Sequence, residues 1–436
     1  MRLKQRRTLL KELFKTLFKS STGTRSVAFR IFRVVYMRYS ADMSLAARFV
    51  TSVKEIPAED WNRVAGDKYP FHRHEFLTAL ENSECVGERS GWIPFHLVLE
   101  DEADNSRTLA ILPLYQKLNS EGEFVFDFAW ARAYHQAGLS YFPKLVAAIP
   151  FTPVTCNCFL IDPQENAADI REKLIATLTG VMRSNEISSL HLLFPTEDEQ
   201  EALTGLGLLA RHDCQFHWHN DNYSDFDDFL SRFTAKKRKK TKRERRKVSE
   251  AGISFDVLEG TEMTEKLWDA VAPLYSSTFL LRGRAPYINT AFFKELSRTL
   301  PEAIVVIIGY KQNEAGDREA VSTAICFKSN TTLYGRYWGA LGHYDSLHFE
   351  TCYYQGIEYC IKHGLELFEP GTQGEHKLAR GFTPTTTHSA HWISDERFAG
   401  AIAEYLEQEG EHVDAYSDML AGHTPYKAAP QESGND

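Results

Sequence analysis

Cysteine is scarce in this sequence, and long apolar runs and the usual motifs of a covalent nucleophile are absent. The 436 residues include only seven cysteines, an odd number, with no Cys-x-x-Cys pair. That usage argues against a disulfide scaffold and a zinc finger and indicates a reducing compartment, so we expect a cytoplasmic protein. The best apolar run, residues 304–308, has the length of a buried strand and falls short of the roughly 18 residues that span a membrane. No Ser-His-Asp or Cys-His pattern is present, so any group transfer is expected to be direct.

The composition is that of a folded protein. Hydrophobic residues make up 43% of the chain and charged residues 25%, values typical of domains that bury a core. Because domains usually have roughly 100–200 residues, the length predicts two to four of them.

Positive charge is concentrated in two segments of an otherwise acidic chain. The net charge is −9, yet residues 1–42 hold 11 Lys/Arg against two acidic residues, so the remainder carries −18. Residues 232–247 hold 11 Lys/Arg against Glu244 alone. Such a block either binds an anion or is a solvated helix face, and we expect the anion. The residues expected to bind it are Lys236, Lys237, Arg238, Lys239, Lys240, Lys242, Arg243, Arg245 and Arg246.

The basic N-terminal tail, residues 1–46, has two interpretations. Leucine and phenylalanine recur at helical spacing between residues 9 and 18 with lysines on the other face, which is typical of a helix that lies on a membrane surface. Alternatively, translation starts at Met37 or Met43 and the tail is not part of the mature protein.

Hydrophobic patterning and turn residues predict the same order of elements in both halves of the chain. The first half predicts a strand at 49–56, helices at 58–65 and 74–82, strands at 95–100, 108–117 and 123–130, an irregular stretch at 131–155, a strand at 157–161, a helix at 167–183, a strand at 189–194, a helix at 198–206 and a strand at 210–219. The second half predicts a strand at 253–258, helices at 265–279 and 290–300, strands at 303–310, 320–328 and 331–338, a helix at 347–363, strands at 365–369 and 388–393, and a helix at 396–408.

This order, found twice, is the one expected of the GNAT acyltransferase fold. We therefore predict an α/β (α+β) protein of two tandem GNAT-like domains, each a mixed, mostly antiparallel sheet flanked by helices. The predicted domains are residues 47–222 and 223–410, followed by a polar tail at 411–436.

Five segments carry a resemblance to a known family. They are QFHWHN at 215–220, the basic stretch 236–247, LYGRYWG at 333–339, HFETCYYQGIEYC at 348–360 and FEPGTQGEHKLARGF at 368–382. With them the chain resembles the FemAB-like "peptidoglycan biosynthesis/recognition" family of the GNAT superfamily from about residue 47 to residue 408. The resemblance implies transfer of an acyl or aminoacyl group to the amine of a cell-wall precursor, as in Fem-type aminoacyltransferases that use aminoacyl-tRNA.

The donor is expected to be aminoacyl-tRNA rather than acyl-CoA, and no tightly bound cofactor is expected. A CoA-binding GNAT domain has a Gly-rich turn before its central helix, whose N–H groups hold the pyrophosphate. Residues 339–348 contain two glycines without such a turn. The basic block could instead neutralise the phosphates of tRNA.

The predicted helix at 347–363 supplies one candidate for acid/base chemistry. Glu350, Tyr354 and Glu358 share a face, while the preceding strand places Arg336 and Trp338 on one face. Glu350 could serve the reaction, favour the helix dipole, or pair with Arg336, which could also bind a substrate anion. We expect a functional Glu350.

The segment 369–377 is the strongest site candidate. A proline and two glycines shape its backbone, and Glu375, His376 and Lys377 offer a base, a proton carrier and a cation in succession, with Arg380 nearby. A polar capping loop is the alternative. We predict Glu350, Glu375 and His376 as catalytic residues. The substrate-binding candidates are Arg336, Trp338, Tyr354, Lys377, Arg380, His217 and His219.

A metal site is not expected. His212, Cys214, His217 and His219 fall on a predicted strand, where Cys214 points away from the last two histidines, and no further ligands follow at zinc spacing.

The sequence thus predicts an N-acyltransferase or aminoacyltransferase acting on a cell-wall-related acceptor. Two alternatives stay open: a non-catalytic module that recognises peptidoglycan precursors or RNA, and an acyl-CoA-dependent N-acetyltransferase.

Overall fold

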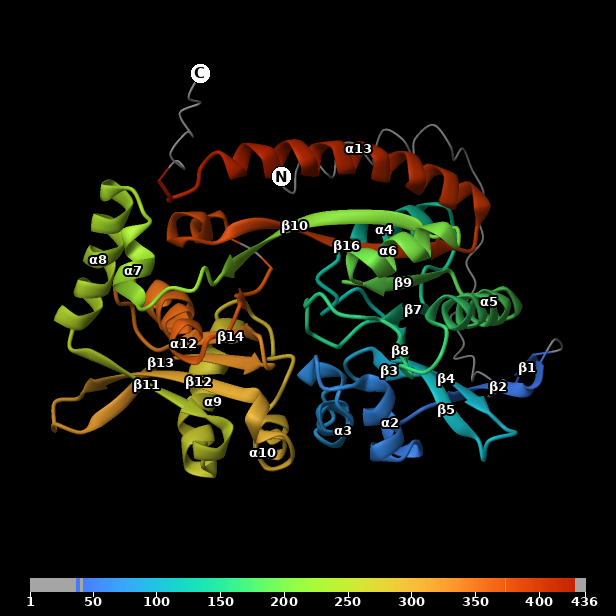
Figure 1. Cartoon of the computed structure of the whole chain (residues 1–436), viewed down its shortest axis with the longest axis horizontal. Coiled ribbons are helices and arrows are strands. Elements are labelled where there is room, and N and C mark those ends of the chain that lie inside the picture. The colour runs from blue at the N-terminus through green and yellow to red at the C-terminus, as the bar shows by residue number, and fades with distance from the viewer. Residues whose placement is uncertain (1–36, 40–41, 373, 428–436) are drawn as a thin grey trace, which may run out of the picture. The chain divides into compact units, whose positions relative to one another are not determined.

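The computed structural model describes residues 37–39, 42–372 and 374–427 (Figure 1). These residues form two compact units, each built from three stretches of chain. Unit 1 contains the chain up to Asp213, Tyr287–Leu296 and Thr386–Tyr416, and unit 2 contains Cys214–Pro286, Ser297–Thr385 and the chain from Ser417. The predicted N-terminal amphipathic helix lies outside the described residues. Within them, no helix has the length and apolar character that a membrane span requires.

Unit 1 holds two groups of strands. One is a sheet in the order β1-β2-β4-β5-β8, and the other has the order β16-β9-β7-β6-β3. Its strands are β1 (Met37–Tyr39), β2 (Asp42–Val50), β3 (Trp92–Pro94), β4 (His96–Asp101), β5 (Arg107–Leu112), β6 (Leu114–Lys117), β7 (Lys144–Ala147), β8 (Leu160–Ile161), β9 (Ser189–Leu193) and most of β16 (Thr383–Ile393). Its helices are α2 (Ala58–Ala65), α3 (His74–Asn82), α4 (Phe128–Gln136), α5 (Ala167–Asn185), α6 (Glu197–Gly205) and most of α10 (Thr290–Thr299) and α13 (Glu396–Ala421).

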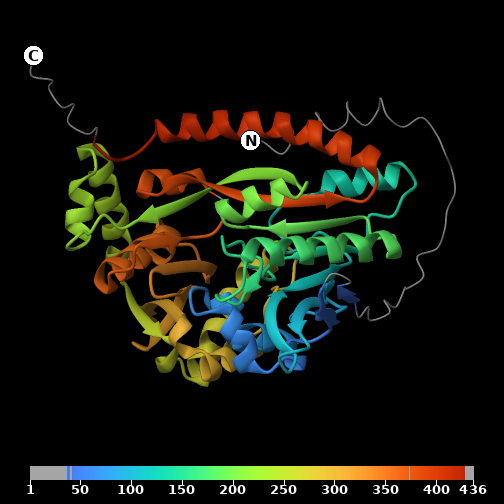
Figure 2. The same cartoon turned by 45° about the vertical axis from the view of Figure 1, so that its right-hand side comes forward.

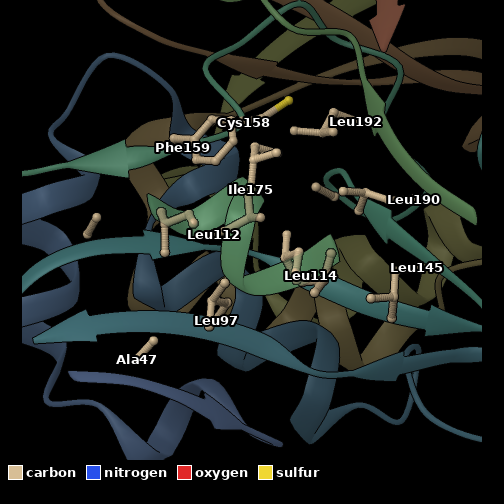
Figure 3. Close-up of a cluster of buried hydrophobic side chains, with 14 of the residues drawn as sticks. Ala47, Leu97, Leu112, Leu114, Leu145, Cys158, Phe159, Ile175, Leu190 and Leu192 are labelled. Carbon is tan, nitrogen blue, oxygen red and sulfur yellow. The ribbon is translucent and has the colours of Figure 1, made fainter. Parts of the chain in front are cut away.

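The largest core of unit 1 lies between these strands and α5. Leucines of β4, β5 and β6 pack with Leu190 and Leu192 of β9 and with Ile175 of α5 (Figure 3). In Figure 2, α5 lies along β9, which agrees with that packing. The apolar positions of α5 recur every three or four residues, as expected for a helix with one buried face.

Unit 2 has a six-stranded sheet in the order β11-β12-β13-β14-β15-β10. The strands are β11 (Ile253–Glu259), β12 (Ile304–Gln312), β13 (Arg318–Lys328), β14 (Thr332–Ala340), β15 (Leu367–Glu369) and the second half of β10 (Leu209–His219). The helices are α7 (Phe226–Ser231), α8 (Ala235–Glu250), α9 (Glu265–Leu280), α11 (Leu347–Phe349) and α12 (Gln355–His363). A π-helical turn, η5 (Glu350–Tyr354), separates α11 from α12, and a 3₁₀ helix, η6 (Glu375–Arg380), follows β15.

Consecutive residues of β14 contact helices on opposite faces of this sheet. The Tyr337 ring lies 5.2 Å from the Tyr275 ring of α9, whereas the Trp338 ring lies 4.9 Å from the His348 ring of α11. Gly339 allows α9 to approach closely, because a Cβ at this position would meet the Leu274 carbonyl oxygen at 1.7 Å. Helix α9 therefore covers one face of the sheet, and α11 and α12 cover the other (Figure 1).

The predicted fold class is confirmed: the chain is a mixed α/β protein whose sheets are flanked by helices. Residues 304–308 are fully buried within β12, as their apolar run predicts. The division into two contiguous domains at residue 222 stays a prediction. The two compact units of the structure are not contiguous, because each is built from three separate stretches of chain.

Several predicted elements were wrong in detail. The first strand ends at Val50, not at residue 56. Residues 108–117 form two strands because Pro113 has no N–H to donate to a ladder. Residues 123–130 form no strand, since Asp127 precedes the first turn of α4, and the stretch 131–155 contains the rest of α4 and β7. The last helix runs thirteen residues beyond residue 408, because Val413 and Leu420 continue its buried face.

Candidate active site

The strands β14 and β15 run parallel for only three residue pairs and then part. The last pair is Tyr334 with Glu369, where β15 ends while β14 continues to Ala340. Just beyond that pair, the register between β13 and β14 shifts so that Arg336 is an extra residue on β14. Bulges of this kind re-aim side chains and are common beside active sites. The segment 369–377, predicted as a site, begins where the strands part.

The helix facing this point contains a π-helical turn. The predicted helix 347–363 is interrupted at Glu350–Tyr354, which inserts one residue into the helical repeat. π-turns are rare and occur frequently at functional sites. The inserted turn positions the Tyr353 hydroxyl 2.8 Å from Nε2 of His376 in η6.

His376 is a solvent-exposed imidazole held among aromatic rings. Its ring centroid lies 5.6 to 5.7 Å from those of His348, Phe349 and Tyr353. Partial burial, together with the charges of Arg380 and Lys377, lowers the pKa of His376 below its ordinary value. The imidazole is therefore neutral at pH 7 and able to accept a proton.

Lys377, the next residue, points into the protein instead of into solvent. Its ammonium group donates a hydrogen bond to the Gly371 carbonyl oxygen, and the side chain is buried. Burial lowers the pKa of Lys377 to about 7; the Cys352 thiol opposes this, and the Arg336 guanidinium adds to it. A lysine with such a pKa can both hold and release a proton under physiological conditions.

Glu369, at the end of β15, is a second buried group with a displaced pKa. Burial raises the pKa of Glu369 to about 8, although the Arg336 guanidinium opposes the shift. Its Oε2 has no hydrogen-bond partner among the described residues. Perturbed groups that gather at one point of a fold are typical of functional sites.

Two of the predicted site residues, Arg380 of η6 and Tyr354 of η5, bind the same carboxylate of α8 and so fix their elements against that helix. Arg380 Nη2 donates to both carboxylate oxygens of Glu244 at 2.9 Å, and its guanidinium lies 3.3 Å from the centre of the Phe349 ring. Tyr354 donates its hydroxyl proton to the same carboxylate at 2.5 Å. Arg380 also donates to the His376 carbonyl oxygen at 2.6 Å, which fixes the backbone of the exposed histidine.

Glu350, a predicted catalytic residue, is committed to an ion pair. Arg245 of α8 donates to both of its carboxylate oxygens at 2.9 to 3.1 Å and to Glu358 as well. Glu350 is 3% exposed, and Gln355 donates a further hydrogen bond to it at 2.8 Å. The hydrogen bonds from Arg245 and Gln355 thus occupy the Glu350 carboxylate, and we assign Glu350 a positioning role. Its partner is Arg245 rather than Arg336.

The remaining predicted residues take different positions around the site. Glu375 is exposed at the start of η6, and Trp338 packs on His348. His217 is buried in β10, where burial lowers its pKa to about 3, whereas His219 is exposed. In the part of the chain that the structure describes, no three His, Cys, Asp or Glu side chains are arranged to hold a metal ion.

The basic helix α8 has an inner and an outer face. Thr241, Glu244 and Val248 are buried, and Arg245 is turned toward Glu350. Three cations of the outer face are in exposed ion pairs: Lys242 with Asp227, Arg246 with Glu250 and Lys247 with Asp345. A fourth, Lys240, lies 3.8 Å from the Glu244 carboxylate. Lys236, Lys239 and Arg243 are exposed and make no ion pair within the described residues.

Sequence reasoning missed His348, Tyr353 and Glu244, and it included Glu369 in the candidate segment without giving it a role. On an ideal helix Tyr353 falls on the apolar stripe that packs in the core, and the π-turn that changes its direction has no clear sequence signal. Glu369 could have been found from its strand, since a carboxylate that ends a short buried strand is unusual.

Comparison with known proteins assigns the chain to a family. The sequence model described as "peptidoglycan biosynthesis/recognition", FemAB-like, matches residues 52–428. No curated protein matches the sequence.

Solved structures of similar fold share little sequence with the chain. A crystal structure of FemX is 10% identical, with 80% of this chain and 98% of that one covered and a TM-score of 0.48. The C-terminal domain of a putative lysylphosphatidylglycerol synthetase from Agrobacterium fabrum is 10% identical, with 80% and 96% covered and a TM-score of 0.48. A tandem GNAT protein from the clavulanic acid biosynthesis pathway is 10% identical, with 80% and 99% covered and a TM-score of 0.41.

Proposed function

Since the chain belongs to the FemAB-like family of peptidoglycan biosynthesis and recognition proteins, we propose that it is a transferase that moves an acyl or aminoacyl group onto the amine of a cell-wall precursor. One observation carries the proposal: the neutral, exposed imidazole of His376 is fixed by Tyr353 where β14 and β15 part. Acyl transfer to an amine requires a group that removes the amine proton, and this imidazole is a suitable one.

In the proposed reaction, the amine nitrogen attacks the acyl carbonyl carbon while His376 takes the amine proton. The tetrahedral intermediate then collapses, the bond to the donor's oxygen or sulfur breaks, and a proton goes to the leaving atom. Lys377, whose pKa is about 7, can supply that proton. Arg380 and Glu244 act only by holding η6 in place.

Activity of the full chain with defined donors and acceptors tests this reaction. Purified protein is incubated with aminoacyl-tRNA or acetyl-CoA and with precursor peptides that carry a free amine, and the product is identified by mass spectrometry. His376→Gln is expected to lower kcat/KM about 100-fold or more, the usual contribution of a general base. His363→Ala, which removes an exposed imidazole at the C-terminal end of α12, is the matched control. Ligand binding without turnover in the wild type would favour a recognition module instead.

We favour aminoacyl-tRNA as the donor, because the outer face of α8 offers cations that no carboxylate among the described residues neutralises. Each contact between such a cation and a phosphate makes the affinity for nucleic acid depend more steeply on salt concentration. Acetyl-CoA carries few phosphates, so it could contact only some of the cations along a helix of this length.

A triple substitution tests the donor. Lys236→Gln/Lys239→Gln/Arg243→Gln should weaken tRNA binding and lower the slope of log Kd against log salt by about 2. The control removes the same charge from exposed residues elsewhere, Lys54→Gln/Arg89→Gln/Lys362→Gln. Turnover with acetyl-CoA that is unaffected by the triple substitution, without any turnover of aminoacyl-tRNA, would instead identify acyl-CoA as the donor.

A further inference from the structure

The C-terminal end of α9 exposes two adjacent leucines. Leu280 is 65% exposed and Leu281 is 86% exposed, the largest values among the exposed large hydrophobic side chains of the described chain. Single exposed leucines are ordinary on protein surfaces, but two neighbours at the tip of one element form a continuous apolar point.

Hydrogen bonds hold this tip in one conformation. The N–H of Arg284 donates to the Phe279 carbonyl oxygen at 3.1 Å, and the N–H of Gly283 donates to that of Leu280 at 2.9 Å. Gly283 has φ +67°, so the pair of bonds is a Schellman motif with glycine at the left-handed position. The usual apolar contact of that motif is absent, because the residue after the glycine is Arg284. The leucines are therefore held outward by a well-formed helix end and are not part of an irregular loop.

The charged residues of the tip segment itself are all positive. Arg282 and Arg284 are both exposed, and the sequence contains no acidic residue between Asp269 and Glu295. Arg282 Nη1 also donates to the Thr278 carbonyl oxygen at 2.9 Å, which keeps one guanidinium beside the leucines. Apolar side chains flanked by arginines match the surface of an anionic bilayer, where the leucines reach the acyl-chain boundary and the arginines meet phosphates.

We propose that residues 280–284 are a contact site for an anionic phospholipid bilayer. Leu280 and Leu281 insert below the headgroups, and Arg282 and Arg284 bind lipid phosphates. A peripheral contact of this kind would concentrate the protein at a membrane surface without a spanning helix. The inference does not depend on the proposed reaction.

Vesicle sedimentation of the full chain tests the proposal. Wild-type protein is expected to bind phosphatidylcholine vesicles that contain phosphatidylglycerol and to bind vesicles of phosphatidylcholine alone more weakly. Leu280→Ser/Leu281→Ser should lower the partition coefficient about tenfold or more. Arg282→Gln/Arg284→Gln should lower it about fivefold for each arginine and remove most of its salt dependence. Leu139→Ser, a leucine of unit 1 that is 40% exposed, is the matched control and should bind as wild type does.

A second measurement follows the tip itself. The tryptophan fluorescence of Leu281→Trp should shift to shorter wavelength when anionic vesicles are added. Lipids with brominated acyl chains should quench this fluorescence more strongly than they quench that of the wild-type protein. The absence of wild-type binding to anionic vesicles would overturn the proposal. So would unchanged binding by both double variants, since that result would assign membrane contact to other residues, such as those of the basic N-terminal segment.

Discussion

At the scale of single residues, burial decides the chemistry of the candidate site more than neighbouring charges do. Lys377 and His376 are adjacent in sequence, yet one side chain is enclosed and the other meets solvent. Desolvation is the largest cause of both lowered pKa values, and it places Lys377 near pH 7 and leaves His376 neutral. Two adjacent groups thus acquire different proton affinities because η6 turns them in different directions.

The pH dependence of the reaction should report these two groups. Activity should rise as His376 loses its proton and fall above about pH 7 as Lys377 loses its own, which gives a bell-shaped profile of kcat/KM. Lys377→Arg should move the alkaline limb to higher pH, because arginine stays protonated. Lys377→Met should lower the rate at every pH without lowering Tm, since it removes a buried charge. Lys328→Arg, in β13, serves as the control, and an alkaline limb that does not move in Lys377→Arg would rule out this role for Lys377.

At the scale of elements, the basic helix α8 combines a structural face with a solvated one. Its composition alone suggests a single function for all of its cations. Glu244 and Arg245, however, are bound to Arg380 and Glu350, so they fix η6 and the π-turn. Only the cations that turn outward are available to an anionic ligand. The helix therefore links the candidate donor-binding surface to the candidate catalytic residues.

Arg245 should matter for stability and Arg246 should not. Arg245→Met leaves the buried Glu350 carboxylate without its cation, and we expect a loss of about 3 kcal/mol in the free energy of unfolding. Arg246→Met, whose native side chain is 67% exposed, should change it by less than about 0.5 kcal/mol. Urea unfolding monitored by circular dichroism measures both. A change in Arg245→Met as small as that in Arg246→Met would show that the ion pair with Glu350 adds little to stability.

At the scale of the whole molecule, the chain returns to complete the unit that it began. Unit 1 contains the first 213 residues, but β9 pairs with β16, and Trp130, Tyr134 and Tyr141 pack against Phe398 and other residues of α13. Both β16 and α13 come from beyond residue 380. The early residues alone therefore cannot bury the aromatic cluster around α4.

A fragment of residues 47–222 should fail to fold on its own. Without β16 and α13, the aromatic residues of α4 would be exposed, and we expect aggregation or a loss of near-ultraviolet circular dichroism. Addition of a peptide spanning residues 386–421 should restore a monodisperse complex on gel filtration. A fragment that is monomeric and cooperatively folded without the peptide would support contiguous domains divided near residue 222.

Much of the fold could be predicted because the relevant patterns are local. The buried strand at 304–308, the amphipathic α5 and the glycine that ends α12 depend on residues a few positions apart. The errors occurred where a distant contact overrides the local pattern, as in residues 123–130. There Lys144 draws Glu123 and Asp127 into buried ion pairs, so the segment does not extend as a strand.

The sequence by itself determined the family and most of the α/β order of elements, and it predicted the segment 369–377 as the candidate site. Only the tertiary structure decided which charges in and around that segment face solvent and which are already paired. Arg245 and Glu350 are 105 residues apart, and Arg380 and Glu244 are 136 apart. Side chains at such separations meet only after the chain has folded, and burial, which sets the pKa values of Lys377 and Glu369, is likewise a property of the folded unit.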